Sequence, residues 1–216
     1  MTIKKNLAML AVAALSTGIA LSAPALAEDS PWMVRVRALH IGPANKSDAV
    51  PALGLPSDQI DVSSKWAPDI DFEYFFTPNW SSELLLTVPQ KHTVSVKGVG
   101  DIGTFKHLPP TLTVKYGFLP DGVVRPYVGA GINLTLIMDV NLAVPLETPL
   151  PLKLQSSSVG GALQAGVDVK LDQHWFGSLD VKYVQIRSDV KLADGTKVSA
   201  VQVDPWLIGI GAGYRF

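Results

Sequence analysis

The stretch "DPWLIGIGAGYRF", residues 204–216, divides into two different sets when alternate positions are compared. One set is large and apolar and consists of Trp206, Ile208, Ile210, Ala212, Tyr214 and Phe216. The other set is mostly small or charged and consists of Leu207, Gly209, Gly211, Gly213 and Arg215. A period of two residues is typical of a β-strand whose two faces meet different surroundings. The end of the chain therefore predicts a strand with one apolar face.

Seven further segments alternate in the same way, at residues 32–39, 66–76, 80–88, 111–118, 125–138, 158–171 and 175–186. Arginines and carboxylates share one face, which cannot point into lipid and must therefore line the interior. The apolar face then points outward, the reverse of a soluble barrel. Short connections at 77–79, 119–124 and 172–174 alternate with long segments at 40–65, 89–107, 139–157 and 187–202. This pattern predicts an all-β fold, an eight-stranded antiparallel transmembrane β-barrel with short periplasmic turns and long extracellular loops.

The first 27 residues have the features of a cleavable secretory signal peptide. Lys4 and Lys5 precede an apolar run at 7–21, and an Ala-x-Ala site ends at Ala27. The run is too short for a convincing membrane anchor, which is the alternative interpretation. We therefore expect a signal at residues 1–27 and a single barrel domain at residues 28–216.

Composition narrows the class of protein further. Without Lys4 and Lys5 the formal net charge is about −3, which gives no reason to expect a nucleic-acid partner. The chain has no cysteine, so disulfides and thiol chemistry are excluded. Mean hydropathy is +0.25 and charged residues make up 17%, although no apolar run of 18 residues follows the signal. An exported, apolar chain of this kind is expected in the bacterial outer membrane, in contact with its lipid.

Aromatic residues gather at the predicted strand ends, where they suggest an interfacial girdle. They are Trp32, Phe76, Trp80, Phe118, Trp175, Tyr214 and Phe216.

Charged residues of inward parity predict a plug in the lumen. They are Arg35, Arg37, Glu73, Glu83, Lys115, Arg125, Asp168, Lys170, Asp180, Lys182 and Arg215. Eight strands leave an interior that is only wide enough for side chains or one small ligand. Opposite charges in that space should pair and block water. A narrow ion path is the alternative.

Nearer the outer strand ends, the residues of inward parity are mostly apolar. They are Leu39, Thr135, Ile137, Val184, Ile186 and Leu207. An apolar lining above a charged plug predicts a hydrophobic pocket that opens to the outside, unless these side chains pack against one another. Pro109, Pro110 and Pro205 lack an N–H donor near the same ends, which favours local gaps in the strand ladder and a lateral opening.

Other motifs carry little chemistry. "GVGDIG", residues 98–103, has the letters of a dinucleotide fingerprint but lies between predicted strands, so we interpret it as a turn. The four histidines, His40, His92, His107 and His174, lack metal-site spacing and are expected to be solvated. No catalytic residue, metal or cofactor is predicted. A lipid-processing enzyme with a loop histidine near Ser95 or Ser156 is a minor alternative.

Three stretches, "GDIGTFKHLPPTLTVKYGF", "RPYVGAGIN" and "DPWLIGIGAGYRF", resemble the OmpW family of small outer-membrane β-barrels, which includes AlkL-type importers of hydrophobic solutes. The resemblance covers the whole chain after the signal. It implies that Tyr214 and Phe216 form the signal that the barrel-assembly machinery reads.

The resemblance also implies a narrow extracellular pocket for small hydrophobic molecules. The expected function is their uptake, with lateral exit into the membrane. A structural, adhesive or receptor barrel that acts through its loops is the alternative. The segments 43–64 and 143–154 are particular to this sequence, so the resemblance does not identify the solute.

Overall fold

The computed structural model describes residues 30–49, 56–144, 150–192 and 194–216. The regular structure in these ranges consists of β-strands. Within them, no helix is long and apolar enough to cross a membrane. The predicted signal peptide at residues 1–27 lies outside the described residues.

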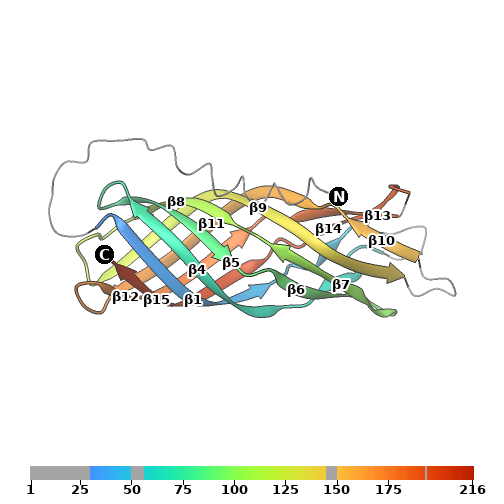
Figure 1. The fold of residues 1–216 in the computed structure, drawn as a ribbon, viewed down its shortest axis with the longest axis horizontal. Coiled ribbons are helices and arrows are strands. Elements are labelled where there is room, and N and C mark those ends of the chain that lie inside the picture. Colours follow the sequence, from blue (N-terminus) through green and yellow to red (C-terminus); the bar gives the residue numbers. More distant parts are fainter. Residues whose placement is uncertain (1–29, 50–55, 145–149, 193) are drawn as a thin grey trace, which may run out of the picture.

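Eight long strands form a closed ring. In the order of their pairing they are β1 (Trp32–Gly42), β4 (Lys65–Phe75), β5 (Trp80–Thr87), β8 (Thr111–Gly117), β9 (Val124–Val144), β11 (Ser157–Lys170), β12 (Trp175–Val184) and β15 (Trp206–Arg215). Each pairs antiparallel with the next, and β15 returns to β1 in a register that runs from Met33↔Arg215 to Gly42↔Trp206. The predicted antiparallel barrel is therefore confirmed, and the last strand of the chain closes it (Figure 1).

The exterior of the ring is apolar and its interior is charged. On β1, Val36 is 58% exposed whereas Arg35 beside it is fully buried. Aromatic pairs mark both edges of the exterior belt. At the end with the short turns, the ring centroids of Trp32 and Tyr74 lie 4.9 Å apart. At the other end, the ring centroids of His40 and Trp66 lie 5.0 Å apart. An apolar band between two aromatic girdles is the surface that a lipid bilayer requires.

The segments that were expected to be long loops contain strands of their own. These are β2 (Lys46–Ser47), β3 (Ile60–Val62), β6 (Gln90–Val96), β7 (Gly100–Leu108), β10 (Leu150–Leu154), β13 (Arg187–Leu192) and β14 (Lys197–Gln202). Together with the outer half of β9 they pair in the order β3–β6–β7–β9–β10–β13–β14–β2. They continue the barrel away from the end at which the C-terminus lies (Figure 1). We call this part the extracellular extension.

Side-chain and backbone hydrogen bonds join the two edges of the extension. The Val62 N–H donates to Asn45 Oδ1 at 2.9 Å, and the Ser47 N–H donates to Asp58 Oδ1 at 3.0 Å. "GVGDIG" lies in the β6–β7 hairpin, where Gly98 and Gly100 adopt φ of 81° and 97°. Gly98 and Val99 form the turn, whereas residues 100–103 begin β7, so the interpretation of this motif as a turn is correct for its first part only.

Candidate functional site

Ten buried ionisable side chains fill the middle of the lumen, and we call them the charge network. They are Arg35, Arg37, Lys115, Lys182, Asp69, Asp71, Glu73, Glu83, Asp168 and Asp180. Each of the four cations lies within ion-pair distance of at least two carboxylates. Buried charges persist only when they are paired and hydrogen-bonded, so the network behaves as one unit.

Arg35 and Glu83 are the centres of the charge network. Arg35 Nη2 lies 2.6 Å from Asp168 Oδ2, and its Nη1 lies 3.2 Å from Asp71 Oδ1 and also contacts Glu73. Glu83 accepts hydrogen bonds from two lysines, Lys182 at 2.7 Å and Lys115 at 3.0 Å. These contacts connect strands from all around the barrel, so the network ties its opposite walls together.

Two hydroxyl groups support the carboxylates, which outnumber the cations. Ser81 donates a hydrogen bond to Glu73, and Tyr127 Oη donates to Asp180 Oδ2 at 3.2 Å. The ammonium group of Lys115 also lies 3.7 Å from the centroid of the Tyr127 ring, a cation–π contact. Tyr127 on β9 therefore contacts both an anion, through its hydroxyl group, and a cation, through its ring.

Eight of the residues predicted for the plug lie in this network, but Arg125 and Arg215 do not. Both are only partly buried because they sit at periplasmic strand ends. Arg125 Nε donates to the Gly122 carbonyl at 2.9 Å, and Arg215 Nε donates to the Ser30 carbonyl at 3.2 Å. Lys170 likewise lies at a strand end and is only partly buried. These three corrections share one cause, since parity gives the face of a residue but not its depth.

Asp69 and Asp71 belong to the network and were not predicted for it. Their parity placed them on the inner face. Arg37 Nη2 lies 3.0 Å from Asp69 Oδ2 and 2.7 Å from Asp71 Oδ2. The register that brings β4 beside β1 sets Arg37 opposite Asp69 and Arg35 opposite Asp71. Alternating arginines and alternating aspartates on adjacent strands were the signal that could have identified them.

The small inward face of β15 makes room for the arginines. A Cβ atom on Gly213 would lie 2.9 Å from Arg35 Cγ, and one on Gly211 would lie 2.6 Å from Arg37 Cα. Neither distance is tolerated by a real side chain. Gly213 therefore makes room for the Arg35 side chain, and Gly211 allows the close approach of the β1 backbone.

A packed apolar layer lies directly outside the charge network. Leu39 and Val184 come two residues after Arg37 and Lys182 on their strands, and Leu207 pairs with Lys182. All three are at most 3% exposed and belong to one apolar cluster. They were predicted to line the pocket, but the structure places them in the layer beneath it.

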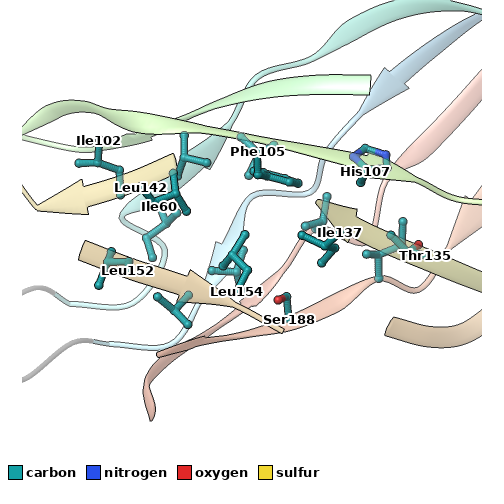
Figure 2. Close-up of a pocket in the computed structure, with 16 residues that line it drawn as sticks. Ile60, Ile102, Phe105, His107, Thr135, Ile137, Leu142, Leu152, Leu154 and Ser188 are labelled. Atoms are coloured by element: carbon teal, nitrogen blue, oxygen red, sulfur yellow. The ribbon is translucent and has the colours of Figure 1, made fainter. Parts of the chain in front are cut away.

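An apolar chamber opens above this layer, inside the extracellular extension (Figure 2). The empty volume of the chamber is about 620 Å³, and this figure includes part of the adjoining solvent. Thirteen of the sixteen lining residues are apolar: Ile60, Val62, Val94, Ile102, Phe105, Ile137, Leu142, Leu152, Leu154, Ile186, Val190, Val201 and Val203. The other three are His107, Thr135 and Ser188. Of the predicted pocket residues, Thr135, Ile137 and Ile186 therefore lie in the lining. Most of the chamber comes from segments that were expected to be loops.

A second cavity lies on the periplasmic side, where Arg125, Arg215, Phe75 and Phe176 are among its lining residues. The two cavities share no lining residue, and the charge network and the apolar layer separate them.

His92 and His107 are buried against each other, contrary to the prediction that they are solvated. They are 0% and 3% exposed, and their rings stack with centroids 4.7 Å apart. The correction follows from the extension, because both residues have inward parity on paired strands. Burial lowers the pKa of His107 to about 3 and also lowers the pKa of His92, so both are neutral near pH 7.

The tautomer of His92 follows from its one hydrogen bond. His92 Nδ1 lies 2.7 Å from the Ser63 carbonyl oxygen, which can only accept. Nδ1 therefore carries the proton, and Nε2 is an acceptor.

The strand ladder is interrupted at Pro109 and Pro110. Leu85 on β5 pairs with Thr111, and the next pair on this seam is Gln90 with His107. Residues 86–89 and 108–110 lie between these pairs without ladder bonds to each other. Two consecutive prolines supply no N–H donor, which explains the interruption. The barrel wall at Pro205, by contrast, is held by hydrogen bonds. The Pro205 carbonyl accepts from the Val184 N–H at 3.2 Å, and Asp204 Oδ1 accepts from the Ile186 N–H at 2.8 Å.

Among the described residues, no group of three or more histidine, aspartate or glutamate side chains is arranged to hold a metal ion.

A closed barrel with an apolar exterior, two aromatic girdles and a divided lumen belongs to the class of small outer-membrane β-barrel proteins. Comparison with known proteins agrees with this class and identifies the family. The model of the OmpW family matches residues 28–216, and the chain belongs to that family. The protein is therefore a protein of the bacterial outer membrane.

Two relatives illustrate the range of the similarity. Outer membrane protein W of Vibrio cholerae is 34% identical over 205 residues, which cover 90% of this chain and 93% of the relative. A protein of Pseudomonas aeruginosa named dibenzothiophene metabolism operon protein PahQ is 27% identical over 204 residues, with coverage of 91% and 93%. Among solved structures, the outer membrane protein OprG of Pseudomonas aeruginosa superposes with a TM-score of 0.74 at 29% identity, over 88% of this chain and 97% of that one.

Proposed function

We propose that this protein takes up small hydrophobic molecules across the outer membrane. The observation that carries the proposal is an apolar chamber inside the extracellular extension that ends above a buried charge network. A hydrophobic solute gains roughly 25 cal/mol for each Å² of apolar surface that leaves water. The name of PahQ, which connects that relative to dibenzothiophene metabolism, supports an apolar aromatic solute.

The exit is proposed to be lateral. Passage through the barrel would require an apolar solute to separate the ion pairs of Arg35, Arg37 and Glu83, which is costly. The interruption at Pro109 and Pro110 lies at the inner end of the chamber, because His107 lines the chamber and Thr111 begins β8. Movement of residues 86–89 away from 108–110 would break no ladder bond. Lipid is the favourable destination for an apolar molecule at that level. This mechanism includes no catalytic step.

Uptake into liposomes that contain the purified protein tests the proposal. Ile137→Arg places an unpaired charge in the chamber lining and should suppress uptake of naphthalene by at least tenfold. Asn141→Arg, an exposed outward position on the same strand, is the matched control and should leave uptake unchanged. Equal uptake by both variants and the wild type would exclude the chamber as the route.

A second candidate function, adhesion through the extension, is favoured by one surface feature. Lys153, Lys191 and Lys197 lie opposite one another on the adjacent strands β10, β13 and β14. Asp189 Oδ1 lies 2.7 Å from Lys197 Nζ and compensates part of this charge, but three cations in one row still offer a surface that a polyanion could bind. An adhesin would bind such a polyanion and would not accelerate hydrophobic uptake, so the same liposome assay separates the two functions.

A further inference from the structure

We propose that the chamber selects neutral molecules with an apolar body and one hydrogen-bonding group, such as a phenol or an alcohol, over the parent hydrocarbons. The hydrogen-bonding group would lie at the inner end, against His107 and Ser188. This inference rests on the proposed function and specifies the chemistry of its solute.

The chamber lining is graded from apolar to polar. Ile102 and Leu152 lie toward one end of the chamber, and His107 and Thr135 lie toward the other (Figure 2). The polar end is the inner one, since Thr135 precedes Ile137 on the way out along β9 and Ser188 precedes Val190 along β13. A solute with one polar end therefore has one favourable orientation.

Two of the polar side chains at the inner end have unused hydrogen-bonding capacity. His107 and Ser188 are 3% and 5% exposed, and His107 Nε2 and Ser188 Oγ have no hydrogen-bond partner among the described residues. Thr135 Oγ1 donates to Asn133 Oδ1 at 2.6 Å, which leaves its lone pairs free to accept. A buried polar group without a partner is unfavourable, so a ligand that supplies the partner is favoured.

The chemistry of these groups defines the class of ligand. A neutral imidazole and a hydroxyl each offer both a donor and an acceptor, so they match a hydroxyl or carbonyl group. No lysine, arginine, aspartate or glutamate contributes to the described lining, so a carboxylate or an ammonium group would enter without a counter-charge. A hydrocarbon would fill the space but would leave His107 and Ser188 unpaired. Sites of this kind discriminate strongly against analogues that lack the polar group.

The test compares 1-naphthol with naphthalene, which have the same ring system and differ by one hydroxyl group. Binding is measured by equilibrium dialysis of the protein in lipid nanodiscs, and empty nanodiscs are subtracted to remove partitioning into lipid. The wild type should bind 1-naphthol at least tenfold more tightly than naphthalene. His107→Phe should lose this preference while it still binds naphthalene, and Ser188→Ala should reduce the preference at least threefold.

The outcomes separate the inference from the function on which it rests. Equal binding of the two probes by the wild type, or an unchanged preference in both variants, would overturn the inference and leave hydrophobic uptake intact. Binding of neither probe would overturn both. Ser188→Ala removes one atom, so it keeps the test decisive if His107→Phe does not fold.

Discussion

Arg35 and Asp168 are 133 positions apart in the chain, yet Arg35 Nη2 lies 2.6 Å from Asp168 Oδ2 in the centre of the lumen. They belong to β1 and β11, which are not neighbours in the ring of strands. Their contact therefore crosses the lumen and can form only in a barrel that has closed. Closure of the sheet therefore brings together two buried charges of opposite sign that neutralise each other.

Replacing Arg35 with Met should destabilise the barrel by about 3–5 kcal/mol, because Asp168, Asp71 and Glu73 would lose a buried partner. The urea midpoint of the folded protein in micelles measures this loss. The double variant Arg35→Met with Asp168→Asn should lose less than the sum of the single effects, since the two residues interact directly. Strictly additive losses would show that the contact contributes nothing specific.

The two faces of the barrel wall should respond differently to one new charge. Ile210 is 57% exposed on the lipid face, midway along β15 between Trp206 and Tyr214. Ile210→Arg should therefore cost about 2–4 kcal/mol of folding free energy in a bilayer. Ile137→Arg faces the chamber and should cost less, so the order of the two variants in vesicle-folding titrations checks the register. The opposite order would contradict it.

Gly211 should not tolerate even alanine. Its Cβ would overlap the Val36 carbonyl oxygen and lie 2.6 Å from Arg37 Cα, so Gly211→Ala should destabilise the barrel by about 1–3 kcal/mol. Gly177→Ala is the matched control, because a Cβ there meets no atom within 4 Å. Thermal unfolding of the two variants in micelles measures the difference. Identical transition temperatures would show that the glycine is not required for close packing.

The extracellular extension should become less stable in acid. The pKa of His107 is about 3 in the folded protein, below the ordinary value of 6.5, so its contribution is complete above pH 6.5 and is lost as the pH falls toward 3. Burial also lowers the pKa of His92, which stacks on His107, and nearby Lys65 adds to that lowering.

Amide hydrogen exchange of residues 90–108, normalised to peptide rates at each pH, measures this effect. Opening should become easier by at most about 1.4 kcal/mol per pH unit for each histidine. His107→Phe should flatten the profile. A pH-independent opening free energy in the wild type would contradict the assignment.

We propose that Phe216 acts in assembly beyond its place in the aromatic girdle. It is 57% exposed, and its N–H donates to the Trp32 carbonyl at 3.2 Å. Phe118 is a girdle aromatic at the same end and is 53% exposed, so Phe118→Asp is the matched control. Phe216→Asp should lower the amount of folded, heat-modifiable barrel in cells far more than Phe118→Asp. Equal amounts of folded barrel for the two variants would show that Phe216 acts only as an interfacial aromatic.

Much of the membrane barrel follows from local sequence, because a period of two residues assigns every side chain to a face. Parity alone places Arg35, Lys115 and Asp180 inside, and all three are buried. Depth along the barrel depends on strand tilt and register, which link distant segments. For that reason, parity could not exclude Arg215 from the network or distinguish the packed layer at Leu39 from the chamber lining.

The extension was harder to predict, because turns and bulges interrupt its alternation. The β6–β7 pair shifts register between Val94 and Ser95, and Asp139 on β9 has a φ of 50°. The inner face of the strands that carry His92 and His107 is defined only by the strands with which they pair, and the local sequence does not show that pairing. Their burial depends on the closure of the extension.

The 21 residues of β9 form one strand from the periplasmic turn to the outer part of the extension, with an irregularity at Asp139. Residues 134–144 lie beyond the last β8 partner of this strand, and at about 3.4 Å per residue they can carry the wall up to roughly 35 Å further out. The outer surface of Gram-negative bacteria is covered by hydrated sugar chains, which slow the approach of apolar compounds. Under the proposed uptake function, this continuation of the barrel wall would carry the entrance of the chamber into that coat. An apolar molecule would then have a shorter aqueous distance to cross before it reaches a dry surface.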